Sequence, residues 1–177
     1  NKSYHLAGYG AGNWDAFGLR FGGAYSWNDV SMDRSVVLAD GVNSLAGDYS
    51  AGTAQVFGEV GYSFAAPLAH FEPFASLAYV NLHSDGFTER GGPAALTARS
   101  SSEGVTYSVL GVRAEAQLAP SASLKAALGW QHAFGDTTPE REFAFASGSL
   151  PFVVTGVPIA EDAVVVEAGL DYAILPN

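Results

Sequence analysis

Four acidic residues are spaced so that strand alternation would place them on the same polar side as several basic and amide residues: Glu59, Glu115, Glu167 and Asp171. Carboxylates held in a confined space perturb one another's pKa, and such pairs perform general acid–base chemistry in many enzymes. Networks of structural charges produce the same kind of cluster. The sequence therefore leaves two interpretations, a catalytic carboxylate pair and a solvated polar lining, and we favour the lining.

Other kinds of catalytic or metal site have weaker support. The histidines are scattered, with neither an HExxH motif nor an i, i+4 pair, so we expect no metal site and no cofactor: His5, His70, His83 and His132. The closest approach to a G-x-S-x-G nucleophile elbow is GYSFA at 61–65, which ends in alanine. Only His132 and Asp136 lie near enough in sequence to suggest a hydrolytic site on a loop.

Strands must position these side chains, because apolar residues recur at every second position. Four segments alternate clearly, at 17–28, 54–64, 110–118 and 164–174. Three more are extended but less regular: 3–12, 70–83 and 124–131. The sequence thus predicts about seven strands of roughly 9 to 15 residues, longer than the usual ~5–6 and matching the ~9–11 that cross a bilayer at a tilt.

The alternation separates two sets of residues onto opposite faces. The polar face is predicted to carry Arg20, Gln55, Glu59, Arg113, Glu115, Gln117, Lys125, Gln131, Glu167 and Asp171. The apolar face is predicted to carry the aromatic residues Phe17, Phe21, Tyr25, Trp27, Tyr62, Phe64, Trp130 and Tyr172. Phe57 is an exception, because it falls on the polar side.

The connections alternate in length. Short turns are expected at 13–15, 65–69 and 119–121, and long polar loops at 31–51, 84–102 and 136–160. In an up-and-down antiparallel sheet, successive connections lie at opposite ends. Outer-membrane barrels have this asymmetry, with short periplasmic turns and longer extracellular loops.

Composition narrows the class of protein. The 177 residues are 48% hydrophobic and 15% charged, with a formal net charge of -10 and no cysteine. The acidic balance argues against nucleic acid as a partner. No apolar run approaches the ~18 residues of a spanning helix. We therefore favour a membrane barrel with its apolar face toward lipid over a soluble ligand-binding barrel with that face inside.

A run of segments in order resembles the translocator β-domain of classical autotransporters, the type V secretion proteins. These segments cover nearly the whole chain, and it is their order that makes the resemblance specific: YHLAGYG (4–10), GLRFGGAYSWNDVSMDRS (18–35), AQVFGEVGYSF (54–64), FEPFASLAYVNLHSDGFTERGGPAAL (71–96), SVLGVRAEAQL (108–118), LKAALGWQHAFG (124–135) and FVVTGVPIAEDAVVVEAGLDY (152–172).

The resemblance implies an all-β fold, a transmembrane antiparallel up-and-down barrel of 12 strands, of which residues 1–177 are similar to about strands four to ten. By that comparison the family's plug helix and terminal strands are not in this chain. It implies a non-enzymatic outer-membrane domain that anchors an N-terminal passenger and exports it to the cell surface. The implied partners are outer-membrane lipid, the protein's own passenger and linker helix, and the barrel assembly machinery.

The charged residues then have an expected role. We expect the polar face to line a water-filled bore, in which Arg20 and Arg113 pair with acidic neighbours or with the plug. The alternatives that remain are an outer-membrane surface barrel with a hydrolytic site in its long loops, and a soluble ligand-binding β-barrel.

Overall fold

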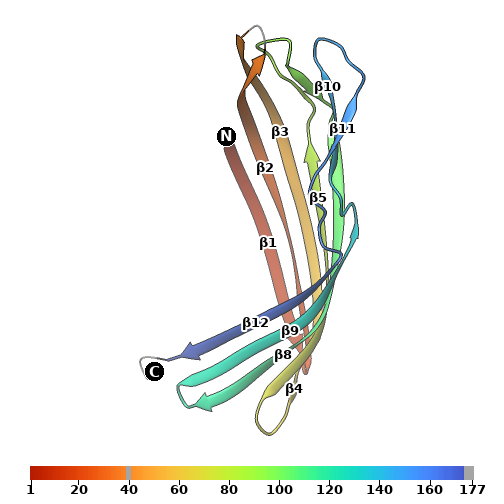
Figure 1. Ribbon diagram of the computed structural model, residues 1–177. Coiled ribbons are helices and arrows are strands. Elements are labelled where there is room, and N and C mark those ends of the chain that lie inside the picture. The colour runs from red at the N-terminus through yellow and green to blue at the C-terminus, as the bar shows by residue number, and fades with distance from the viewer. Residues whose placement is uncertain (39–40, 174–177) are drawn as a thin grey trace.

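The computed structural model describes residues 1–38 and 41–173, and this part of the chain is all β (Figure 1). Each strand of the main sheet is antiparallel to its neighbours. The order across the sheet is β1 (Lys2–Trp14), β2 (Phe17–Leu38), β3 (Gly41–Tyr62), β5 (His70–Ser84), β8 (Ser101–Ala119), β9 (Ala122–Gly135) and β12 (Asp162–Tyr172). The short β4 (Phe64–Ala65) pairs with β5. The seven long strands that alternation predicts are confirmed; the end of the last predicted strand, at 174, lies outside the described residues.

The main sheet curls into an open half-barrel. Figure 1 shows β1 to β5 forming one wall, and β8, β9 and β12 turning away from it to form the other. Within the described residues, β1 and β12 are the edges, since each pairs with one neighbour. No helix of the described ranges is long and apolar enough to cross a membrane.

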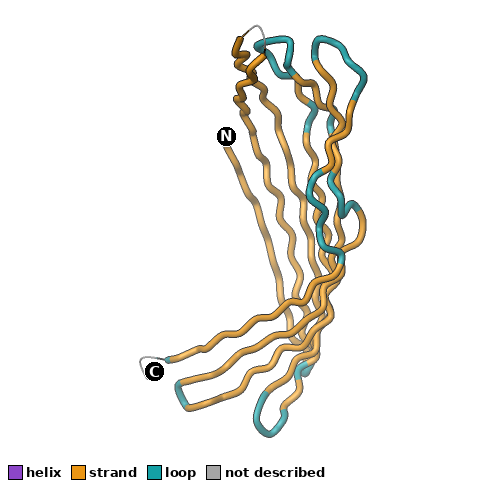
Figure 2. The backbone as a smooth tube through the Cα atoms, in the orientation of Figure 1, coloured by secondary structure: helices purple, strands orange, loops and turns teal. Residues whose placement is uncertain are grey.

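The tight turns and the long connections lie at opposite ends of the sheet, as predicted (Figure 2). At the end with long connections, four short strands form a second antiparallel sheet in the order β11-β10-β7-β6. Its strands are β6 (Phe87–Thr88), β7 (Leu96–Ala98), β10 (Glu140–Phe145) and β11 (Phe152–Thr155).

The prediction that 31–51, 84–102 and 136–160 are loops is therefore wrong, because each of these segments contains strands. The segment 31–51 is the outer half of a hairpin, because β2 and β3 stay paired up to Leu38 and Gly41. The other two connections supply the small sheet. Backbone hydrogen bonds join that sheet to β3: Arg90 and Ala46 exchange them at 2.8 and 2.9 Å, and Asp85 donates to Ser50 at 2.9 Å.

The apolar face of the hairpin changes sides along its length. In the first half of β2 the apolar side chains alternate up to Trp27 on one face. Beyond it Val30, Met32 and Val36 are half-buried on the other face, together with Arg34, while the odd-numbered residues between them are exposed. On β3, Leu45 is only 2% exposed and packs with Ala94, Ala95 and Val36. The outer part of the hairpin thus has its own small core.

Candidate functional site: the polar inner face

All ten residues predicted for the polar face lie on one face of the main sheet, and all eight predicted aromatic residues lie on the other. Register shows this directly, since residues paired across antiparallel strands share a face. Arg20 is opposite Glu59, Glu115 is opposite Lys125, and Phe17 is opposite Tyr62. The two faces that alternation predicts are therefore confirmed as faces of one sheet.

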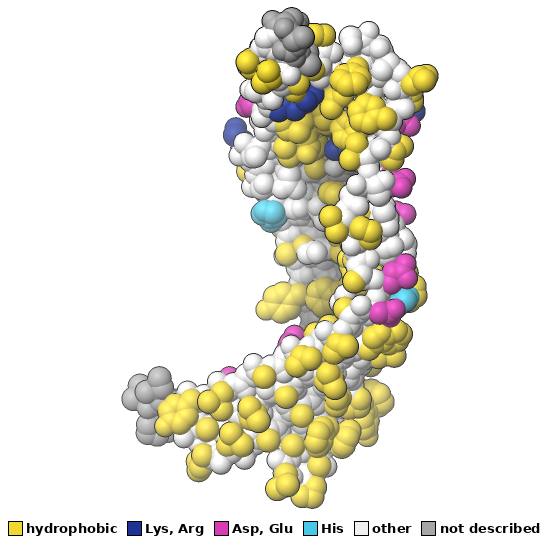
Figure 3. Space-filling model, in the orientation of Figure 1, with side chains coloured by type: hydrophobic (Ala, Val, Ile, Leu, Met, Phe, Trp, Pro, Cys, Tyr) yellow, Lys and Arg dark blue, Asp and Glu magenta, His cyan; other side chains and the backbone are white. Residues whose placement is uncertain are grey.

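The polar face is the inside of the curve. Two ion pairs on this face reach over an intervening strand, which curvature toward that side makes possible: Arg20 of β2 to Glu72 of β5, and Arg113 of β8 to Glu59 of β3. Hydrophobic side chains cover the outside of β8, β9 and β12 (Figure 3). A soluble ligand-binding barrel would have the opposite arrangement, with its apolar face inward.

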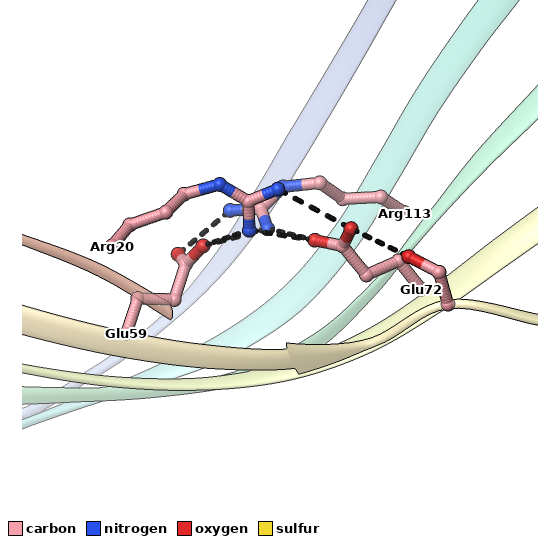
Figure 4. Close-up of polar contacts among 5 residues, drawn as sticks. Arg20, Glu59, Glu72 and Arg113 are labelled. Carbon is pink, nitrogen blue, oxygen red and sulfur yellow. Dashed lines mark hydrogen bonds and ion pairs between the residues drawn. The ribbon is translucent and has the colours of Figure 1, made fainter. Parts of the chain in front are cut away.

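Four charged side chains form one closed cluster on the inner face (Figure 4). Arg20 Nη1 donates to Glu59 Oε1 at 2.8 Å and to Glu72 Oε1 at 2.7 Å. Arg113 donates through Nη1 and Nη2 to the two oxygens of Glu59, at 2.8 and 2.7 Å, and through Nη1 to Glu72 at 2.9 Å. Each arginine thus contacts both carboxylates, and the cluster joins β2, β3, β5 and β8.

The local sequence builds this cluster from strand register and one glycine. Arg20 faces Glu59, and Glu72 faces Arg113, as direct cross-strand pairs. The side chain of Glu72 lies across Gly61, where a Cβ atom would come within 2.9 Å of the carboxylate. A side chain at position 61 would have to move the Glu72 carboxylate away from the place where it reaches both guanidinium groups.

Arg20 and Arg113 are expected to pair with acidic neighbours or with the plug, and both pair with the acidic neighbours Glu59 and Glu72. Glu72 was missed among the site residues, because its strand has apolar residues on both faces and its alternation is ambiguous. Phe74, one of those residues, lies under Arg113, with the guanidinium carbon 3.8 Å from the ring centre. The arginine is thereby held by the two carboxylates and by a cation–π contact.

The remaining charged candidates lie nearer the end with short turns. Lys125 pairs with Asp171, and both side chains are more than half exposed. Glu115 and Glu167 line a hollow of about 540 Å³ that also borders the ion-pair cluster. Gln117 donates to the backbone of the β8–β9 turn, whereas Gln55 and Gln131 are on the inner face by register alone.

His132 and Asp136, whose nearness in sequence suggested the alternative of a hydrolytic loop site, have other partners, and Asp136 accepts the backbone N–H of Gly104 at 2.8 Å. His132 Nδ1 is instead 2.9 Å from Asp162, which also accepts a hydrogen bond from Trp130 Nε1 at 2.9 Å. Register places these three side chains on the outer, apolar face, away from the carboxylates of the inner face. In the described ranges, no group of three histidine or acidic residues could hold a metal ion.

A second charged pair stabilises the outer half of the hairpin. Arg34 donates to both oxygens of Glu89, at 2.7 and 2.6 Å, and to the carbonyl of Ala94. Glu89 is 5% exposed and also accepts the backbone N–H of Leu96. The hydrogen bonds from Arg34 hold the pKa of Glu89 below its usual value, against an opposing effect of burial. Neither residue was among the predicted site residues.

The chemistry available on the inner face is therefore that of a polar wall. Its strongest charges neutralise one another, while Glu115 and Glu167 have no ion-pair partner within the part of the chain that the structure describes. Such a wall keeps water and polar chain segments on one side and apolar contacts on the other.

Comparison with known proteins gives a consistent result. The family model described as "Autotransporter beta-domain" matches residues 1–177. Two proteins named extracellular serine protease, both from Serratia marcescens, are 34% and 35% identical to this chain over 180 and 176 residues, which cover 100% and 98% of it. The chain spans 17% of the length of each of these relatives.

Among solved structures, the translocator domain of the autotransporter NalP from Neisseria meningitidis has a similar fold. The TM-score is 0.57 at 17% sequence identity, and the match covers 96% of this chain and 66% of the NalP chain. At this level of identity the likeness concerns the fold.

Proposed function

The chain belongs to the autotransporter β-domain family, and on that premise we propose that it forms part of the wall of an outer-membrane barrel that anchors an N-terminal passenger and exports it to the cell surface. The observation that carries the proposal is the two-faced sheet, in which an ion-paired polar face lies inside the curve and an apolar face lies outside. Only a closed barrel satisfies all strand backbone groups in lipid. As the resemblance to the family implies, we assign residues 1–177 to about strands four to ten of a 12-stranded barrel.

The inner face is the wall of the bore in this proposal. The ten polar residues predicted from the sequence, together with Glu72, contact water and the polypeptide in transit, and the ion-pair cluster braces four strands against each other. The domain acts as a conduit, and its bore has no catalytic residue of its own. The serine protease activity in the names of the Serratia proteins would then reside in the passenger.

The outer face is the lipid contact. Seven of the eight aromatic residues form two groups along the strands, and Phe21 lies between these groups. Those near the short turns are Phe17, Tyr62, Phe64 and Tyr172, and those farther out are Tyr25, Trp27 and Trp130. Phe17 and Trp27 are ten residues apart on β2, which at ~3.3 Å per residue and a tilt near 40° spans about 25 Å, the height of the apolar band of such barrels. The small sheet and the outer hairpin then lie in water on the extracellular side.

The proposed partners are those that a barrel of this kind requires. Outer-membrane lipid covers the apolar face, the passenger and its linker helix occupy the bore, and the barrel assembly machinery inserts the domain. The support from this chain is the division of its surface into an apolar outer and a polar inner face.

Two neighbouring residues on β8 test the proposal. Leu110 is on the outer face and Val109 on the inner face. In the full-length protein expressed in a Gram-negative host, Leu110→Arg places a charge on the lipid-facing surface directly opposite Trp130, where the cost is below the about 2–4 kcal/mol that applies at the midplane. We expect it to reduce outer-membrane assembly and the amount of passenger that external protease removes from whole cells.

Val109→Arg is the matched control, because it adds the same side chain to the bore. We expect assembly and passenger exposure close to those of the unchanged protein. Equal effects of the two substitutions would refute the assignment of faces. A full-length protein whose passenger never reaches the surface would refute the export function itself.

A further inference from the structure

Three residues on the outer face form a row across neighbouring strands, and their types are those of a hydrolytic triad. Ser108 of β8 is directly opposite His132 of β9, and His132 is directly opposite Asp162 of β12. Residues paired in this way share a face and have Cβ atoms about 4.5–5.5 Å apart. Register thus brings a serine, a histidine and an aspartate together from three different strands.

The histidine ring is oriented as a general base requires. Its Nδ1 lies 2.9 Å from Asp162 Oδ1, and because a carboxylate only accepts, this nitrogen carries the proton. The neutral ring then presents Nε2 as the proton acceptor. Trp130 Nε1 donates to the same carboxylate oxygen at 2.9 Å, and Phe134 packs edge-on against the His132 ring. The aspartate and the ring are therefore both held in place.

Ser108 is the residue that can give its proton to this base. In the described residues no hydrogen bond joins its hydroxyl to His132 Nε2, and a bond of this kind commonly tightens only when substrate binds. Another serine of β8 lacks the complete arrangement. Ser102 is opposite His83, but Asp85 lies 3.5 Å from Nε2 of that ring, which is the nitrogen that a base must keep free.

The row lies at the outer edge of the apolar band. The next row toward the short turns is apolar and exposed: Leu110, Trp130 and Val164. Trp130 belongs to the outer group of aromatic residues, and His132 is two residues, or ~6.6 Å along the strand, farther out. At this level the ester groups of outer-leaflet lipids join acyl chains to headgroups. An acyl chain on the apolar row therefore places its ester beside Ser108.

We infer that Ser108 and His132 are the catalytic residues of a lipid acyl hydrolase on the outer face, with Asp162 as the positioning residue of the base. The inference goes beyond the proposed export function and takes from it only the contact between the outer face and lipid. The substrate class is an acyl ester of an outer-leaflet lipid, because the ester is the carbonyl group that lipid presents at this level.

The reaction has two steps. Ser108 Oγ attacks the carbonyl carbon of the ester while His132 Nε2 takes the hydroxyl proton. The bond from that carbon to the alcohol oxygen breaks, and His132 returns the proton to the departing alcohol. Water, which is present at the headgroups, then attacks the acyl-serine with the same proton transfers. The products are a fatty acid and the deacylated lipid.

A fluorophosphonate, which bonds covalently to an activated serine, tests the nucleophile in the purified full-length protein in detergent. We expect mass spectrometry to find the label on Ser108, which separates this site from any serine of the passenger. Asp162→Asn should slow this labelling about a hundredfold or more, because the ring loses the carboxylate that fixes its tautomer. Ser102→Ala is the matched control, on the same strand and face, and should label Ser108 at the original rate. A folded barrel without label at Ser108 would overturn the site.

Release of fatty acid from vesicles measures the hydrolysis itself. One set of vesicles contains phospholipid alone and the other also contains lipopolysaccharide, so the mass of the released fatty acids shows which lipid is cleaved. We expect Ser108→Ala to lower the rate about a hundredfold or more, with the folded barrel confirmed by gel mobility without heating. Equal release by the unchanged protein and by Ser108→Ala would overturn the hydrolase. Failure of the unchanged protein to export its passenger would instead overturn the proposed function.

Discussion

Loss of Arg113 should destabilise the barrel wall more than its position on a water-exposed face implies. Its side chain is 36% exposed, but it donates three hydrogen bonds to Glu59 and Glu72, whose side chains are only 11% and 18% exposed. Replacing it by methionine leaves Glu59 with Arg20 as its only cation in the cluster and changes the cluster from neutral to a charge of -1.

The magnitude lies between two known limits. Exposed ion pairs contribute about 0–1 kcal/mol, and removing one partner of a buried pair costs about 3–5 kcal/mol. For a half-buried arginine that also lies on Phe74, we expect Arg113→Met to lower the free energy of unfolding by about 2–3 kcal/mol. Adding Glu59→Gln restores neutrality, so the double variant should be less destabilised than the sum of the single ones, with a coupling of about 1–2 kcal/mol.

The assay is equilibrium unfolding of the full-length protein in urea, with the fraction of folded barrel followed by gel mobility without heating. Lys125→Met is the control, because it breaks an exposed pair on the same face and should shift the urea midpoint far less. The reasoning is refuted if Arg113→Met unfolds at the midpoint of the unchanged protein, or if the double-variant effects are additive.

Three further predictions follow from the same geometry. Reversing one charge of the cluster with Arg20→Glu should open the wall and raise single-channel conductance in planar bilayers, and unchanged conductance would count against a bracing role. Hydrogen bonds from Arg34 lower the pKa of Glu89, so this pair stabilises the small sheet at pH values above the unfolded pKa of ~4.3. The stabilisation is lost as the pH falls through the lower pKa of the folded state. Amide exchange around the pair should therefore accelerate on acidification below pH ~4 and should not change between pH 6 and 8. Gly91→Ala should loosen the small sheet by about 1–3 kcal/mol, because φ is +120° there and a Cβ atom would collide with the carbonyl of Ser44; limited proteolysis of whole cells measures it.

Strand positions and faces could be read from the sequence because alternation is strong in the segments that separate lipid from water. The 17–28 segment has an apolar side chain or glycine at every odd position from Phe17 to Trp27. Long-range pairing is a different matter: that Arg20 reaches Glu72 over an intervening strand depends on the curvature of the sheet, which no local pattern encodes. The contact of His132 with Asp162 likewise depends on which strands are neighbours and on their register, not on nearness in sequence.

The outer hairpin could have been found. In SMDRSVVLADGVNSLAGDYS (31–50) the apolar positions continue to alternate but in the opposite phase, with Met32, Val36 and Leu45 inward. The high polarity of the segment is typical of a loop, whereas its alternation is that of a strand whose apolar face has changed sides. A search for alternation that allows one change of phase would have identified it.

Because the apolar face changes sides between Trp27 and Val30, a β2–β3 hairpin inserted in the wrong register is destabilised both within the membrane and outside it. A slip of one residue would turn Arg20 toward acyl chains and, in the same movement, turn Leu45 out into water. A slip of two residues preserves both faces, but it moves the point at which the apolar face changes sides out of the headgroup region. During insertion, therefore, few misaligned hairpins should persist long enough to compete with the correct one.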